Sequence, residues 1–233
     1  MWLTSIKKQC RLCSTLYSRF RAFFCFLFRP QAYCHAIHSR TYDTDTRVVD
    51  INAAAPDCSC ERFRMSKHSP KPVAASEVIS RFVFSPMHLT KKGELNPSFF
   101  SHAMSKGCSV QRDSLATDDE LVSFTREFLS RKDEYAWVAV AATTSDALRR
   151  LENTETGKRT VCVYDTAEPN NPAHAEICRT QHIQEADAAE LRRSLMRAFN
   201  DGVPIDRQVY RNGRVWHALP AELQARPIKR PRK

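Results

Sequence analysis

The chain has 233 residues, a formal net charge of +10 at pH 7 and nine cysteines. This length fits one domain or two small ones and is sufficient for a buried core. The apolar run at residues 22–28 is far shorter than the roughly 20 residues needed to cross a bilayer, so we expect no membrane span.

The basic charge is concentrated at the two ends of the chain. Residues 1–64 carry ten Lys and Arg against five Asp and Glu, residues 65–219 carry 21 against 20, and residues 220–233 carry five against one. The central part is almost neutral. This distribution argues against a basic nucleic-acid groove on a folded domain and favours basic arms at the ends.

Composition divides the chain into four parts. Residues 1–64 hold six of the nine cysteines and lack helix caps and hydrophobic periodicity. We expect them to be a disordered extension, or a stretch upstream of a natural start at Met65; an Arg-rich targeting segment is the alternative. Residues 65–74 are expected to be a linker, residues 75–219 an α+β domain, and residues 220–233 a basic tail.

Within the domain, apolar runs and capping signals predict strands and helices in turn. Strands are expected at residues 79–84, 108–112, 135–142, 160–164 and 174–178. Helices are expected at residues 97–106, 118–131, 145–151 and 185–200. Asn212-Gly213 between β-rich flanks predicts a hairpin at residues 209–216. The order predicts an α+β fold: a mixed sheet of about five to seven strands, two long helices mainly on one side, and a C-terminal hairpin.

The cysteines favour a reducing compartment. Cys108, Cys162 and Cys178 are an odd, widely spaced set in the domain, so we expect free thiols and a cytoplasmic protein. Cys10-x2-Cys13 with Cys34-x3-His38 has a spacing that zinc ligands can have. No turn glycine lies beside either pair, so we expect neither a metal nor a cofactor.

Two histidines directly follow X-Pro turns at the edges of predicted strands: His88 in SPMH and His174 in NPAH. A rigid turn can hold an imidazole where a pKa near neutrality permits proton transfer. We therefore predict His88 and His174 as an acid–base pair for metal-independent phosphodiester or nucleotide chemistry, with Arg112 holding the anion. The alternative is that each imidazole bonds a turn carbonyl and that Arg112 forms an ordinary ion pair.

Two further residues are predicted to contact the substrate. Asp165 directly follows a buried strand, and Arg179 lies just beyond another. An Asp in that position can also cap the following turn, which is the structural alternative.

Each of the two histidines lies in a tripeptide that resembles a motif of a known enzyme family. His88-Leu-Thr90 resembles the H-x-T motif of two-histidine phosphoesterases, and His174-Ala-Glu176 resembles the H-x-E motif of zinc deaminases. The chain lacks the second H-x-[ST] of the first family and the later cysteine pair of the second. We therefore assign neither family.

The segments SPMH, GCSVQR and NPAHAEI resemble parts of small uncharacterised bacterial accessory-genome proteins. This resemblance implies a bacterial toxin or anti-phage defence component, but it brings no activity. The leading hypothesis is a cytoplasmic accessory protein that acts on or beside nucleic acid. The rival hypothesis is a non-catalytic subunit or antitoxin-type binder with a protein partner.

The tail is Pro-broken and basic, so it is expected to be extended. Its charged residues are predicted to contact nucleic acid or an acidic protein; they are Arg226, Lys229, Arg230, Arg232 and Lys233. Solubilising the C-terminus is the alternative role.

Overall fold

The structure, a computed structural model, describes residues 26–85, 87–90, 95–130 and 136–200. Its strands are β1 (Val78–Ser85), β2 (Cys108–Arg112), β3 (Ala136–Thr144), β4 (Val161–Asp165) and β5 (His174–Arg179). Its α-helices are α2 (Pro30–Thr41), α3 (Arg47–Ala54), α4 (Asp118–Ser130), α5 (Ser145–Arg149) and α6 (Ala188–Asn200). Three short 3₁₀ helices are η1 (Pro56–Arg62), η2 (Pro97–Met104) and η3 (Glu185–Asp187).

The five strands form one sheet in the order β3-β1-β2-β5-β4. Helices and sheet together confirm the α+β class. The sheet is not mixed, however, because every neighbouring pair is antiparallel. The hairpin predicted at residues 209–216 lies outside the described residues.

The pairing of β1 with its two neighbours is unequal. Residues Val78 to Ser85 pair with β3 along their whole length. Against β2, only two pairs are formed, Ile79 with Arg112 and Ser80 with Gln111. Strands β1 and β2 therefore separate after Ser80, which leaves an opening within the sheet.

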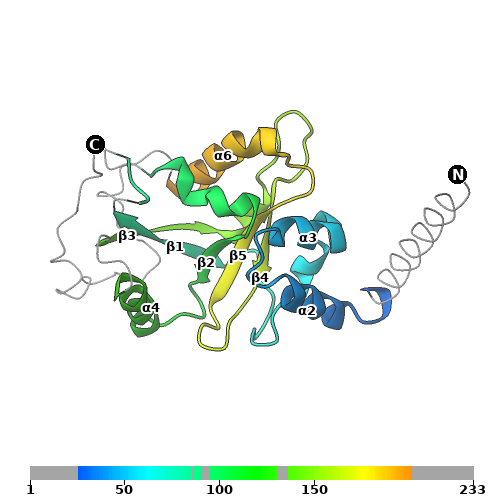
Figure 1. The fold of residues 1–233 in the computed structure, drawn as a ribbon, viewed down its shortest axis with the longest axis horizontal. Coiled ribbons are helices and arrows are strands. Elements are labelled where there is room, and N and C mark those ends of the chain that lie inside the picture. The colour runs from blue at the N-terminus through cyan, green and yellow to red at the C-terminus, as the bar shows by residue number, and fades with distance from the viewer. Residues whose placement is uncertain (1–25, 86, 91–94, 131–135, 201–233) are drawn as a thin grey trace, which may run out of the picture.

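The two faces of the sheet are covered by different helices. Side chains alternate along a strand, so Val161 and Val163 of β4 face α6 and η2, where they join the larger core. Cys162 and Tyr164 point the other way and pack with α2 and α3 in a second core. Figure 1 shows α6 on one side of the sheet and α4 on the other.

Capping residues fix where several helices begin. The Thr117 hydroxyl accepts from the Glu120 backbone N–H, and the Glu120 carboxylate accepts from the Thr117 N–H, which is the predicted capping box before α4. The Asn96 side chain accepts from the Ser98 backbone N–H at the start of η2.

Residues 26–64 were expected to lie outside the domain, and this expectation is wrong. Helices α2, α3 and η1 pack against β4 and β5, with Ile37, Val48 and Ile51 fully buried among them. Figure 1 shows these helices directly beside β4. The described part of the N-terminal region is thus a structural layer of the same body; residues 1–25 are not among the described residues.

One disulfide cross-links this layer internally, and a second attaches it to the sheet. One joins Cys34 to Cys60, and the other joins Cys58 of η1 to Cys162 of β4. The prediction that Cys162 is a free thiol is therefore wrong, whereas Cys108 and Cys178 are free and buried. Because Cys34 is oxidised, it is also unavailable for the zinc arrangement considered above.

A membrane crossing finds no support in this fold. None of the helices between residues 26 and 200 that the structure describes combines the length and the apolar character that a bilayer span requires.

Candidate functional site

Arg112 is completely buried and lies in a structural network. Its Nε and Nη2 donate to the two carboxylate oxygens of Glu77 at 3.0 and 2.9 Å, and its Nη1 lies 3.4 Å from Asp165 Oδ1. Its remaining donors reach the carbonyl oxygens of Lys71 and Pro72 at 2.7 and 3.2 Å. Every side of the guanidinium is thereby occupied, and no donor is left for a substrate anion.

The pKa values of the carboxylates around Arg112 are shifted in opposite directions. Burial acts to raise the pKa of Glu77, but hydrogen bonds from Arg112 and Ser114 outweigh it and lower the pKa. Burial raises the pKa of Asp165 to about 6, opposed by Ser69 and Arg112. Asp165 therefore lies beside Arg112, as part of the network that holds the segment before β1.

His174 is also tied to the fold. Its Nδ1 lies 3.0 Å from Thr166 Oγ1 and 3.1 Å from the Thr166 carbonyl oxygen. It pairs across the sheet with Gln111, and it shares a face with Glu176, which binds Arg47 of α3. His174 thus lies on the α2 and α3 side of the sheet.

His88 lies on the side of η2. Its Nδ1 accepts from the Phe84 backbone N–H at 3.1 Å, and its ring packs edge-on against Phe99 with centroids 4.7 Å apart. Burial and nearby Arg81 lower the pKa of His88 to about 3, so the ring is neutral at physiological pH. The structure therefore does not bring His88, His174 and Arg112 to one place.

The neutral state of two buried histidines should be visible in solution. Burial, first of all, lowers the pKa of His88 to about 3 and that of His38 to about 4. In the unfolded chain both titrate near 6.5, so the unfolded state takes up protons first as the pH falls. The stability they contribute is complete above pH 6.5 and is lost progressively as the pH falls toward the folded pKa values.

We expect the ring nitrogen NMR signals of His88 and His38 to remain those of neutral imidazole from pH 5 to 8, and the free energy of unfolding to decrease below pH 6.5. His88→Gln should remove part of that decrease. A midpoint near 6.5 for either ring in the folded protein would contradict the burial on which this expectation rests.

The other predicted contacts are scattered. Arg179 pairs with Val161 at the opposite end of β4 from Asp165, and its side chain donates to the carbonyl oxygens of Met104 and Ile183 at 3.0 and 2.6 Å. The predicted tail contacts lie outside the described residues; they are Arg226, Lys229, Arg230, Arg232 and Lys233.

A different site lies where β1 and β2 separate. A cavity of about 480 Å³ occupies this opening and is bordered by η2 and α4. Arg81 reaches across it: its Nη1 donates to the Ser109 carbonyl oxygen, and its guanidinium carbon lies 4.7 Å from the centre of the Phe99 ring. None of the carboxylates between residues 26 and 200 that the structure describes forms an ion pair with Arg81.

Polar atoms without partners line the same opening. Ser80 Oγ, Gln111 Oε1 and Arg81 Nε have no hydrogen-bond partner among the described residues. Ser80 is 1% exposed and Gln111 8%, so bulk water does not satisfy them. Buried polar atoms normally have partners, and exceptions call for an explanation such as a bound molecule or ordered water.

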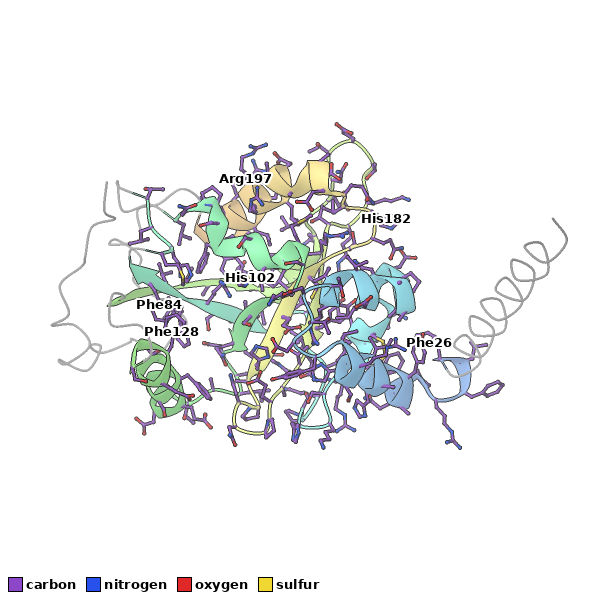
Figure 2. The ribbon with its side chains drawn as sticks, viewed as in Figure 1. Phe26, Phe84, His102, Phe128, His182 and Arg197 are labelled. Carbon is purple, nitrogen blue, oxygen red and sulfur yellow. A yellow bond between two sulfur atoms is a disulfide. The ribbon has the colours of Figure 1, made fainter. Side chains whose placement is uncertain are left out.

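Aromatic rings border the opening on the side of α4. Phe84 of β1 and Phe128 of α4 are stacked, with ring centroids 4.4 Å apart and an angle of 23°. Figure 2 shows these two rings side by side, with His102 on the neighbouring η2. Burial lowers the pKa of His102, and Arg81 lowers it further. The opening therefore combines one cation, unpaired polar atoms and flat apolar surfaces.

Sequence reasoning did not find this site. In an alternating strand Arg81 is expected to be an outward-facing surface residue, and Gln111 is expected to be one as well. Arg81 and Gln111 line a cavity because β1 separates early from β2, and no local sequence motif predicts that separation.

The described residues contain no group of three or more His, Cys, Asp or Glu arranged to hold a metal ion. The chain matches no protein-family model, no curated protein and no solved structure. Any assignment of function therefore rests on the geometry of the sites.

Proposed function

We propose that this chain binds a nucleotide, or one nucleotide unit of a nucleic-acid strand, in the opening between β1 and β2. The observation that carries the proposal is Arg81, a guanidinium in a cavity that forms no ion pair with a carboxylate of the described residues. A phosphate oxygen is a suitable partner for the Arg81 guanidinium, because guanidinium donors match the oxygens of phosphate groups.

The surroundings of Arg81 suit the other parts of a nucleotide. The side chains of Ser80 and Gln111 are adjacent across the strands and supply polar groups at the border of the cavity. The ring of Phe128 is partly exposed and lies on the buried Phe84 ring, so it can stack on a base without demanding a particular sequence.

The proposed role is binding without catalysis by the predicted acid–base pair. His88 and His174 lie on opposite faces of the sheet, and Arg112 is saturated by Glu77 and main-chain carbonyls. This geometry favours the non-catalytic alternative over metal-independent phosphodiester chemistry at those residues.

Replacing Arg81 with methionine is expected to weaken nucleotide binding by roughly tenfold, the loss of one charge-assisted hydrogen bond. The measurement is fluorescence anisotropy of a labelled oligothymidylate, with adenosine and thymidine monophosphates as competitors. In a plot of the logarithm of affinity against the logarithm of salt concentration, the slope should also become less steep, by the contribution of about one phosphate contact.

Arg150→Met is the matched control, because Arg150 is exposed and its ion pair is with Asp146 on α5. Thermal unfolding of Arg81→Met and of Arg81→Lys shows whether each variant remains folded. Equal binding by Arg81→Met and wild type, or no nucleotide binding at all, would contradict the proposal. In that event a protein partner becomes the better explanation of the chain.

The two disulfides are relevant to the redox state of the compartment in which the chain folds. The expectation of a cytoplasmic protein depended on free thiols, yet Cys34, Cys58, Cys60 and Cys162 are paired. Disulfides form and persist in oxidising compartments. We therefore propose that the chain folds in an oxidising environment; recovery of both cross-linked peptides after digestion without reductant tests this.

A further inference from the structure

A second cavity, independent of the opening beside Arg81, lies on the outer side of α2. It measures about 350 Å³ and is enclosed by α2, residues 65–68 and residues 167–169. Tyr42 and Pro169 contribute apolar surface, while His35, His38 and Lys67 contribute nitrogen atoms. This cavity is built partly by the N-terminal layer, and it contains none of the residues predicted for catalysis or substrate binding.

His38 is held in one orientation at the base of this cavity. Arg47 Nη2 lies 2.9 Å from His38 Nδ1, and since a guanidinium can only donate, Nδ1 accepts. Arg47 is itself fixed by an ion pair with Glu176 at 2.9 Å and is only 2% exposed. The neutral ring must then carry its proton on Nε2, the nitrogen that remains for a ligand.

His35 is oriented in a comparable way. The amide nitrogen of Gln31 donates to the Arg64 carbonyl oxygen and lies 2.7 Å from His35 Nε2. That nitrogen of His35 is therefore the acceptor, and the neutral ring has its proton on Nδ1. The cavity thus has two imidazole N–H donors in addition to the ammonium group of Lys67.

The cavity has fewer hydrogen-bond acceptors than donors. Glu168 is the carboxylate that lines it, and one of its oxygens already accepts from the Tyr42 hydroxyl at 3.1 Å. The charge of Arg47 is balanced by Glu176, so Lys67 is the cation that remains for a ligand. The lining is rich in donors and carries one uncompensated positive charge at most.

We propose that this cavity binds the carboxylate of a small organic acid. A carboxylate presents several acceptor sites to the imidazole donors, and its single charge matches the single Lys67. Phosphate monoesters match less well, since a second negative charge would face Glu168 without another cation. The apolar surface of Tyr42 and Pro169 accommodates a short hydrocarbon portion of the ligand.

The test uses the full chain, labelled with ¹⁵N at histidine. The ring signals of His38 and His35 are followed during titration with sodium propionate and sodium benzoate, and separately with inorganic phosphate, at constant ionic strength. We expect saturable shifts with the carboxylates and weaker, non-saturating shifts with phosphate. Lys67→Met should weaken carboxylate binding by roughly tenfold.

Two further variants test whether carboxylate binding depends on the charged residues of this cavity. Glu168→Gln keeps an acceptor for Tyr42 but removes the repulsion, so it should strengthen carboxylate binding. Lys158→Met, an exposed lysine in the turn before β4, is the charge-matched control and should change nothing. Arg81→Met should also leave this binding unchanged, which separates the two sites.

Three results would overturn the proposal. They are the absence of a saturable shift with either carboxylate, tighter binding of phosphate than of propionate, and unchanged carboxylate binding in a folded Lys67→Met variant.

Discussion

Replacing Arg112 with methionine is expected to lower the free energy of unfolding by about 3–5 kcal/mol, because it leaves buried carboxylates without their cation. Glu77 and Asp165 both contact this guanidinium, and its side chain is fully buried. The stability of an ordinary domain is about 5–15 kcal/mol, so this loss is a large fraction of the total. Urea denaturation followed by circular dichroism measures the difference.

A second substitution distinguishes this network from a catalytic role. In the Arg112→Met background, Glu77→Gln removes the carboxylate that has lost its cation. This change should recover part of the lost stability, because an unpaired buried ion is a main cost of breaking a buried ion pair. The exposed Arg150→Met variant should change stability by less than about 1 kcal/mol. An Arg112→Met protein as stable as wild type would show that Arg112 does not hold the fold together.

Breaking the bond between Cys58 and Cys162 should also have a large effect. The bond closes a separation of 104 residues, and losing a native disulfide typically costs about 2–5 kcal/mol. Cys58→Ser is expected to show this loss in denaturation and to expose the N-terminal layer first, because η1 is attached to β4 through this bond. Hydrogen exchange should then be faster in α2 and α3 than in α6.

The matched comparison is the double variant Cys58→Ser/Cys162→Ser. It should be no less stable than Cys58→Ser alone, since the bond is already lost in the single variant. If Cys58 and Cys162 are both alkylated in the folded wild-type protein without reductant, the pairing itself is refuted. Equal stability of Cys58→Ser and wild type would show that packing alone holds the N-terminal layer.

Much of the sheet could be predicted because its signals are local. Strand β2 has the bounds expected from the sequence, Cys108 to Arg112, and helix α4 begins after its predicted capping box. These features depend on alternation, apolar runs and short-range hydrogen bonds, all of which neighbouring residues determine.

The N-terminal layer could not be predicted in this way. Helix α2 buries Cys34, Ile37, His38 and Thr41, a set without the apolar stripe that marks an amphipathic helix. Its stability comes from distant partners, namely the disulfide to Cys60 and the Arg47–Glu176 ion pair. Disulfide connectivity cannot be deduced from sequence alone.

The positions of the predicted site residues relative to one another could not be predicted for a related reason. His88, His174 and Arg112 have residue types common in catalysis, but whether they converge depends on the face of the sheet each one occupies. Arg81 has an unremarkable sequence context, and its environment is created by two strands that separate after Ser80. Register and strand separation are tertiary properties, which is why the sequence could not show that these three residues lie apart.

The Cys58–Cys162 bond has a consequence for the order of synthesis. Cys34, Cys58 and Cys60 leave the ribosome together, whereas Cys162 follows about a hundred residues later. Until β4 has been translated, Cys58 can pair only with cysteines other than its final partner, and such pairs would have to be exchanged afterwards. The segment η1 is therefore made early but reaches its final covalent arrangement late, only when the edge strand of the sheet is present.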